Sequence, residues 1–197
     1  MGALHRMVQG AQYFRDTPMF SCDQSVLLVV DVQGKLASLM FEKEKILENI
    51  RLLIKAAKIL GIPILWTEQA PDKIGKTVPE IAKHMRGYSP IVKSSFSCCG
   101  EKIFLDALKK LKRHQIIVAG IETHVCVYQT VADLVKRKYQ VQVVADAVSS
   151  RTQENKLYGL ERIKQEGGLI TCLEMVCCEL LKKAGGEKFK GILQLIK

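Results

Sequence analysis

Three side chains of this 197-residue sequence could together carry out nucleophilic catalysis: the carboxylate of Asp31, the amine of Lys93 and the thiol of Cys126. Each stands at or shortly after the end of an apolar, β-branched run that is typical of a strand. A thiol becomes a strong nucleophile when a base accepts its proton and a nearby cation stabilises the sulfur anion. We therefore expect these residues to act as base, cation and nucleophile if the fold brings them together.

The turn that precedes Cys126 supports this interpretation. Thr123 is a good N-cap candidate, and a helix from Thr123 to about Arg137 would place Cys126 in its first turn. The free N–H groups and the helix dipole at that end favour a thiolate, and Lys93 would lower the thiol pKa further. Asp31 would accept the thiol proton and later return it to a leaving group, while backbone N–H groups of the turn would hold an oxyanion.

Each of these residues also has an interpretation without chemistry. Asp31 could cap the loop after its strand, Lys93 could be a solvated strand end, and Cys126 could be a buried spacer on the inner face of a helix. His124 is left out of the chemistry, because residues two apart on a helix point in different directions and it would not face Cys126.

The elements that must position these residues alternate between short apolar runs and amphipathic stretches. The runs that predict strands are Ser25–Asp31, Ile62–Thr67, Ser89–Val92, His114–Ala119, Val141–Ala145 and Leu169–Cys172. The stretches that predict helices are Lys45–Leu60, Val78–His84, Ile103–Leu111, Thr123–Arg137, Ser150–Glu166 and Glu174–Lys182, with one or two further turns in Glu187–Lys197. The helix at Ser150 would begin with a capping box that includes Gln153.

This alternation predicts an α/β fold, a doubly wound three-layer sandwich with a six-stranded parallel sheet. In such sheets ligands bind beyond the carboxyl ends of the strands, near the switch in strand order. The residues just past the predicted strands are therefore the ones to consider: Asp31, Thr67-Glu68-Gln69, Lys93, the run from Gly120 to Cys126, and Asp146.

The composition indicates a single globular domain over residues 1–197. Hydrophobic residues make up 48% and charged residues 25%, which excludes a disordered tail protein, and no uncharged stretch approaches the length of a membrane span. The start of the chain lacks the apolar block of a secretory signal, so we expect a cytoplasmic protein. A mitochondrial presequence is the alternative, because Arg6 and Arg15 outnumber the single acid Asp16.

The seven cysteines contain no C-x-x-C pair, and without a secretory signal we expect reduced thiols. Cys98 and Cys99 are adjacent, as are Cys177 and Cys178, and adjacent cysteines rarely form structural bridges. We expect these four and Cys172 to pack in the core as small hydrophobic residues.

The net charge of +10 raises the question of a nucleic-acid partner. The basic residues are spread along the chain, and those at positions 109, 110, 112 and 113 close a predicted helix, where cations suit the dipole. No aromatic residues alternate with them as base-stacking platforms would. A solvated basic face is the preferred interpretation.

Several segments resemble the isochorismatase-like superfamily of cysteine hydrolases. They are VVDVQ around Asp31, KSSFS from Lys93 to Ser97, and GIETHVCVYQT from Gly120 to Thr130. The segments TEQ at 67–69, ADAVSSR at 145–151 and the C-terminal KFKGILQLIK are most similar to the isochorismatase domain-containing proteins of that superfamily. The resemblance covers nearly the whole chain.

The resemblance implies a catalytic triad of Asp31, Lys93 and Cys126 on a doubly wound sheet of six strands, with no cofactor. It also implies a cis peptide bond between Ile121 and Glu122, which would direct the amides of Glu122 and Cys126 at the oxyanion. Candidates for the substrate pocket are Gln33, Thr67, Gln69 and Phe96. Because similar enzymes associate, we expect a homo-oligomer and no membrane partner.

Two departures from the superfamily narrow the reaction. Nicotinamidases similar to this chain hold a metal with an Asp-x-His pattern after the second strand, whereas this chain has Thr67-Glu68-Gln69, so we predict no catalytic metal. Similar enzymes that hydrolyse the vinyl ether of isochorismate lack the cysteine. Cys126 therefore favours acyl transfer, in which a small amide or related C–N substrate gives a thioester that water resolves.

Two functions of other classes stay open on the sequence alone. The chain could be a nucleic-acid-binding protein or ribonuclease that uses its basic surface, and it could be a thiol switch or scaffold without turnover. We expect a small-molecule substrate in preference to both.

Overall fold

The computed structural model describes residues 19–196, in which six strands form one sheet in the order β3-β2-β1-β4-β5-β6. The strands are β1 (Ser25–Val30), β2 (Ile64–Gln69), β3 (Ile91–Lys93), β4 (Gln115–Ile121), β5 (Gln140–Ser149) and β6 (Leu169–Thr171). All five neighbouring pairs are parallel. The strand order reverses between β1 and β4, so the sheet is doubly wound, and the predicted fold class is confirmed.

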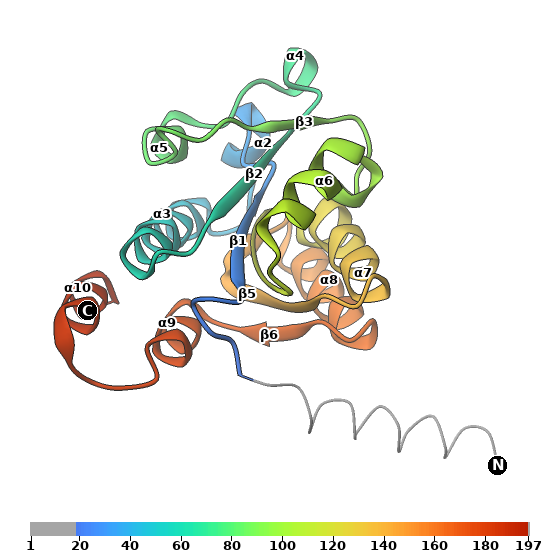
Figure 1. Cartoon of the computed structure of the whole chain (residues 1–197). Coiled ribbons are helices and arrows are strands. Elements are labelled where there is room, and N and C mark those ends of the chain that lie inside the picture. The colour runs from blue at the N-terminus through green and yellow to red at the C-terminus, as the bar shows by residue number, and fades with distance from the viewer. Residues whose placement is uncertain (1–18, 197) are drawn as a thin grey trace.

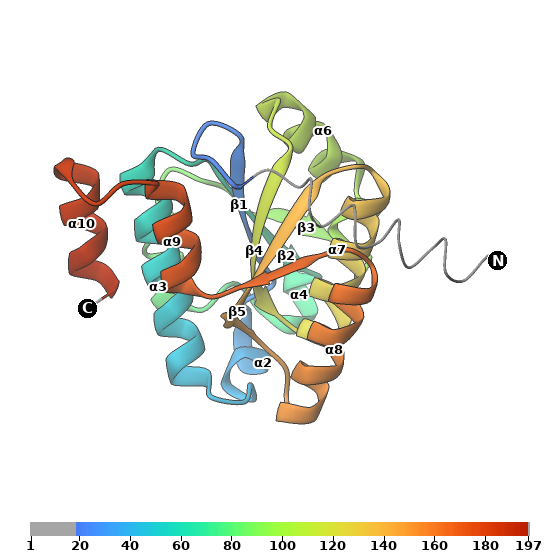
Figure 2. The same ribbon diagram turned by 90° about the horizontal axis from the view of Figure 1, so that it is seen from below.

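Helices cover both faces of the sheet and complete three layers (Figures 1 and 2). On one face lie α3 (Lys43–Leu60), α9 (Leu173–Leu181) and, outside them, α10 (Gly186–Ile196). On the other face lie α6 (Lys102–Leu111), α7 (Tyr128–Lys136) and α8 (Gln153–Gln165). The connections contain α2 (Gly34–Ser38), α4 (Pro71–Ile74), α5 (Pro79–Ala82) and two short turns, η1 (Cys98–Gly100) and the π-helical η2 (Thr123–Val127).

The central strand β1 is buried on both faces, because helices cover both sides of the sheet. Alternate residues of β1 enter two separate hydrophobic clusters. Leu27 and Val29 pack toward α3 and α9, whereas Val26, Leu28 and Val30 pack toward α6, α7 and α8. A continuous apolar run such as SVLLVV is therefore what a strand in this position requires.

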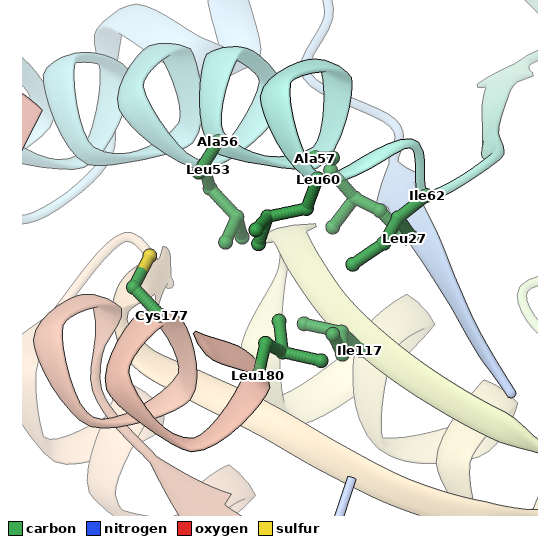
Figure 3. A pocket seen from close by; sticks show the side chains of 9 residues that line it. All are labelled: Leu27, Leu53, Ala56, Ala57, Leu60, Ile62, Ile117, Cys177 and Leu180. Carbon is green, nitrogen blue, oxygen red and sulfur yellow. The ribbon is translucent and has the colours of Figure 1, made fainter. Parts of the chain in front are cut away.

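A small apolar gap remains between α3, α9 and the sheet (Figure 3). Its lining residues are Leu27, Leu53, Ala56, Ala57, Leu60, Ile62, Ile117, Cys177 and Leu180. The gap measures about 10 Å³, which is no more than one water molecule needs, and its walls offer few polar partners to hold a water. This gap is therefore a packing feature of the core and too small for a substrate.

The prediction that Asp146 follows the end of its strand is wrong, because β5 runs on through Asp146 to Ser149. Three other local predictions also differ from the structure. Thr152 caps α8 by accepting a hydrogen bond from the Asn155 N–H at 3.2 Å, whereas the Ser150 hydroxyl is bonded to His124 Nδ1 at 2.9 Å. Thr123 caps no helix, because η2 intervenes before α7 begins, and among residues 19–196 its buried hydroxyl has no hydrogen-bond partner. The C-terminal helix α10 has 11 residues, more than the one or two turns predicted.

Among residues 19–196 there is no helix with both the length and the hydropathy that a bilayer span needs. Arg6, Arg15 and Asp16, which suggested the mitochondrial alternative, lie outside the described residues.

Candidate active site

Four neighbouring strands bring the candidate residues to one edge of the sheet. Asp31 follows β1, Gln69 ends β2, Lys93 ends β3, and Cys126 lies in η2, directly after β4. Gln69 and Lys93 are partners in the parallel register of β2 and β3. The cluster therefore lies at the carboxyl ends of the strands, beside the reversal in strand order where ligand sites of such sheets are found.

Two glycines allow the backbone to approach closely at this edge. Gly120 in β4 has φ +125°, and a Cβ atom there would lie 2.1 Å from the carbonyl oxygen of Val30. At Gly159 in α8, a Cβ atom would lie 2.7 Å from the backbone nitrogen of His124, within η2. A larger residue at Gly120 would push β4 away from the end of β1, and a larger residue at Gly159 would displace the turn that carries Cys126.

Asp31 has φ 50°, a left-handed conformation that is uncommon outside glycine, and only 3% of the residue is exposed. Its Oδ1 accepts a hydrogen bond from the Thr67 hydroxyl at 2.7 Å. Its Oδ2 lies 2.6 Å from the Lys93 ammonium but has no hydrogen-bond partner of good geometry among residues 19–196. Burial raises the pKa of Asp31 above the usual carboxyl value, and Lys93 offsets part of this effect.

The Lys93 side chain has no exposed surface and is surrounded by oxygen atoms. Besides Asp31 Oδ2, its Nζ lies 2.9 Å from Gln69 Oε1, 2.9 Å from the Ser95 carbonyl and 3.0 Å from the Phe96 carbonyl. An environment of acceptors alone suits an ammonium, which only donates. The alternative interpretation of Lys93 as a solvated strand end is therefore wrong.

The loop that supplies these carbonyls is held by Glu101, which the sequence analysis did not single out. Glu101 Oε1 accepts hydrogen bonds from the N–H groups of Ser94 (2.9 Å) and Ser95 (3.2 Å) and from the Ser95 hydroxyl (3.0 Å). These bonds lower the pKa of Glu101. Serines clustered just before a glutamate were the available signal, since their donors need an acceptor nearby.

Cys126 is 8% exposed, and its thiol is protonated at neutral pH. Burial raises its pKa to about 12, the Asp31 carboxylate raises it as well, and the Lys93 ammonium opposes both. The expectation of a resting thiolate is therefore wrong, because burial and a neighbouring carboxylate outweigh the cation. Any nucleophilic role of Cys126 then needs a base that takes its proton during attack.

The sulfur atom has one hydrogen-bonded side chain and one charged neighbour. Cys126 Sγ donates a hydrogen bond to Gln69 Oε1 at 3.4 Å, and the Asp31 carboxylate lies near enough to raise the pKa of the thiol. The carboxylate, the ammonium and the thiol thus meet in one cluster with the Gln69 amide. This arrangement can move a proton from sulfur to carboxylate while a neighbouring cation limits the charge that develops.

Two residues expected in the substrate pocket are buried supports. Thr67 is 1% exposed, and its hydroxyl orients Asp31. Gln33 is 1% exposed; its Nε2 donates to the carbonyls of Gln69 (3.1 Å) and Gly75 (2.6 Å), and its Oε1 accepts from the Gln69 N–H at 2.6 Å. Neither side chain is free to bind a substrate, whereas Gln69 is partly exposed and Phe96 is 53% exposed.

The turn between β4 and α7 has an irregular backbone. The peptide bond between Ile121 and Glu122 is cis. The Glu122 carbonyl accepts hydrogen bonds from the N–H groups of Val125 and Val127, both at 3.1 Å, and the Glu122 carboxylate pairs with Arg151 Nε at 2.9 Å. These bonds hold the segment that carries Cys126.

The other six cysteines are free thiols, and three of the five that were predicted to lie in the core are buried. Cys98, Cys99 and Cys177 are buried, and Cys172 is half-buried. Cys178 is exposed, so its predicted place in the core is wrong. Among residues 19–196, no three His, Cys, Asp or Glu side chains come together in a way that could hold a metal ion.

Comparison with known proteins assigns residues 25–175 to the isochorismatase domain. Isochorismatase domain-containing protein 2 of Danio rerio is 37% identical over 172 residues, which is 87% of this chain and 86% of that protein. The solved structure titled MAR1 ribonuclease from Caenorhabditis elegans has 38% identity and a TM-score of 0.85, covering 91% of this chain and 92% of that one. The YcaC gene product of Escherichia coli, titled an octameric hydrolase of unknown specificity, has 25% identity and a TM-score of 0.86, covering 91% and 89%.

Proposed function

Because this chain belongs to the isochorismatase family of hydrolases, we propose that it is a metal-independent cysteine hydrolase of a small amide-like molecule. The base, cation and nucleophile are Asp31, Lys93 and Cys126. The observation that carries this proposal is the buried ion pair between Lys93 Nζ and Asp31 Oδ2, 2.6 Å long, which Gln69 Oε1 links to the Cys126 thiol through its contacts with Lys93 Nζ and Cys126 Sγ. The last three residues of β2, Thr67-Glu68-Gln69, are the reason for a reaction without a metal, since this segment lacks the Asp-x-His pattern.

The reaction begins when Cys126 Sγ attacks the substrate carbonyl carbon and its proton passes to Asp31. The sulfur–carbon bond forms as the carbonyl π electrons move to oxygen, which gives a tetrahedral oxyanion. When that intermediate collapses, Asp31 returns the proton to the departing nitrogen and a thioester remains. A water molecule then attacks the thioester while Asp31 takes its proton, and the Cys126 thiol is restored as the acid product leaves.

The oxyanion in this scheme is held by the backbone N–H groups of Glu122 and Cys126. Donors aimed at a developing charge in a site shielded from water account for about 3 kcal/mol each in transition-state stabilisation. Both groups lie in the turn that directly follows β4, so the nucleophile and the donors share one rigid segment. The substrate meets the partly exposed Gln69 and Phe96 at the mouth of the site.

The experiment that tests the proposal is a screen of small amides followed by acid quench and mass spectrometry of the intact protein. A productive substrate adds the mass of its acyl group to the wild-type chain, and peptide mapping places this mass on Cys126. A Cys126→Ala variant provides the control. An adduct that maps to another cysteine, or ammonia release by Cys126→Ala at the wild-type rate, contradicts the proposed mechanism.

A ribonuclease is the second candidate, since one relative carries that title and this chain has a basic hollow. The hollow, of about 490 Å³, is lined by Lys58, Lys110 and Arg113 beside Tyr88, and by no acidic residue. These residues precede β2, β3 and β4, so a strand length of about 20 Å separates them from Cys126. A nucleotide held in the hollow itself would therefore lie outside the candidate active site.

We expect this hollow to bind single-stranded RNA weakly, with affinity that falls linearly in a log–log plot against salt, and without cleavage. Fluorescence anisotropy should show weaker binding for the double variant Lys58→Glu/Lys110→Glu and little change for Lys73→Glu, an exposed lysine of α4. RNA cleavage that is lost with Cys126→Ala would support the ribonuclease instead.

We also propose that the protein is a homo-oligomer. Large apolar side chains are exposed at Leu39 (60%), Phe96 (53%), Leu157 (55%) and Tyr158 (68%), and one relative is titled octameric. Light scattering should give a multiple of 22.1 kDa, and a mass of 22.1 kDa at micromolar concentration would contradict this. The single-domain organisation and the cytoplasmic location stay predictions.

A further inference from the structure

The Gln69 carboxamide stands between the nucleophile and the cation of the candidate site. Its Oε1 accepts a hydrogen bond from the Cys126 thiol at 3.4 Å and another from Lys93 Nζ at 2.9 Å. Nothing in the proposed reaction uses this contact.

The orientation of this amide is determined by its neighbours. Lys93 can only donate, so the carbonyl oxygen of Gln69 faces it, and Gln69 Nε2 points to the Ser94 carbonyl at 3.4 Å. The backbone is held on both sides, because the N–H and the carbonyl of Gln69 are bonded to the buried Gln33 amide at 2.6 Å and 3.1 Å. Gln69 therefore presents an acceptor to the thiol and cannot easily present a donor.

An acceptor beside the sulfur stabilises the protonated thiol and disfavours the thiolate. The S–H group can donate to Gln69 Oε1, whereas a sulfur anion would face the negative end of the amide dipole. The same oxygen occupies one of the Lys93 contacts, so the cation acts on the sulfur less directly. The other groups that act on the Cys126 sulfur are Asp31 after β1, Lys93 at the end of β3 and Cys98 in η1.

We propose that Gln69 is a positioning residue whose carbonyl oxygen holds the Cys126 thiol proton away from Asp31 and thereby restrains the reactivity of the nucleophile. This inference rests on the proposed role of Cys126 as nucleophile and adds a regulating contact to it. The sulfur becomes reactive when its proton turns from Gln69 toward Asp31. Methionine at position 69 keeps the length of the side chain but removes the carbonyl, and glutamate keeps the shape but adds a negative charge.

The test is the rate at which iodoacetamide alkylates Cys126 at pH 8, followed by peptide mass spectrometry. At a pH well below the thiol pKa, the alkylation rate is proportional to the thiolate fraction. The rate therefore measures how each substitution changes the thiolate fraction of Cys126. We expect Gln69→Met to react about 3- to 10-fold faster than wild type, the range given by one hydrogen bond, and Gln69→Glu to react several-fold slower. Cys98 is fully buried, and its failure to react in the same samples shows that the fold is intact.

Opposite effects of the two substitutions are the signature of the proposed contact, because simple loosening of the site would accelerate both. An unchanged or slower rate for Gln69→Met, or a faster rate for Gln69→Glu, would overturn the inference. If Gln69→Met fails to fold, Gln69→Asn, which retracts the carbonyl by one methylene, should react at a rate between those of wild type and the range expected for methionine. A rate equal to or below that of wild type would overturn the inference.

The alkylation assay needs no substrate, so its result is separate from that of the amide screen. Shifted alkylation rates together with ammonia release by Cys126→Ala at the wild-type rate would keep the Gln69 contact and reject the hydrolase mechanism. An acyl adduct on Cys126, together with alkylation rates that do not change when Gln69 is substituted, would support the mechanism and reject the proposed role of the Gln69 contact.

Discussion

Replacement of Cys126 by alanine is expected to lower kcat/KM by a factor on the order of 10⁴ to 10⁶. The reason is that nucleophile, base and cation act as a unit, so the loss of sulfur removes the covalent path and leaves only binding and the oxyanion donors. The measurement is the initial rate of amine or ammonia release with the substrate found in the amide screen, at enzyme concentrations high enough to detect the residual rate.

Two other cysteine substitutions control for this result. Cys178→Ala changes an exposed thiol, and Cys98→Ser changes the buried thiol that lies 3.8 Å from the Thr67 hydroxyl. We expect the first variant to keep the wild-type rate and the second to lose no more than about tenfold, because the Cys98 thiol contacts the Thr67 hydroxyl that supports Asp31 and is not itself the proposed base, cation or nucleophile. A Cys126→Ala enzyme that keeps more than a tenth of the wild-type kcat/KM would rule out a covalent role for this thiol.

The pH dependence of the wild-type rate follows from the two raised pKa values. Asp31 must be ionised to accept the proton, so activity falls as the pH drops through its raised pKa. The thiol pKa of about 12 produces no rise in rate near pH 8.5, where an ordinary cysteine ionises. Proton transfer during attack is therefore consistent with the burial of Cys126, whereas a preformed thiolate is not.

The positions of the candidate residues could be predicted from the sequence because a parallel sheet simplifies the geometry. Each crossover is right-handed and each strand ends at the same edge, so residues after the strands must gather there whatever lies between them. Asp31, Lys93 and Cys126 are 62, 33 and 95 residues apart in their three pairings, yet strand ends alone were enough to group them.

The protonation state of the cluster could not be predicted in this way. A helix dipole and a nearby lysine are visible in the sequence, and both favour a thiolate. The opposing effects are the burial of Cys126 and the nearness of the Asp31 carboxylate, and their size depends on how η2 packs against the sheet. The sequence therefore indicates the contributions that lower the thiol pKa, whereas the size of the larger contributions that raise it follows only from the structure.

The roles of Gln33 and Thr67 were also hidden, for a related reason. A polar residue near a strand end can face the ligand or support its neighbours, and residue type does not distinguish the two. In the structure Gln33 is bonded to the backbone of Gln69 and Gly75, and Thr67 to Asp31, which satisfies their buried polar groups. Only three-dimensional contacts reveal which polar group is already satisfied.

Replacement of Lys93 by methionine is expected to destabilise the protein by about 3 to 5 kcal/mol at pH 7.5, because the substitution leaves the buried Asp31 carboxylate without its cation. Asp31→Asn leaves the Lys93 ammonium with neutral acceptors only and should also destabilise the protein. The double variant Asp31→Asn/Lys93→Met removes both charges, so its free energy of unfolding should fall by less than the sum of the decreases in the two single variants. Urea unfolding of the four proteins measures this coupling.

The decrease in the free energy of unfolding caused by Lys93→Met should also depend on pH in a defined direction. Without Lys93 the pKa of Asp31 in the folded protein rises further above 3.8, while the unfolded chain keeps the ordinary value. Above 3.8 the folded protein then binds more protons than the unfolded chain, so the free energy of unfolding falls as pH rises toward the folded pKa. The free energy of unfolding of Lys93→Met should thus be closer to that of wild type at pH 5 than at pH 7.5. The double variant should not show this pH dependence. Equal destabilisation at both pH values would mean that the Asp31 carboxyl is solvated and that the ion pair is not the buried base and cation on which the proposed reaction depends.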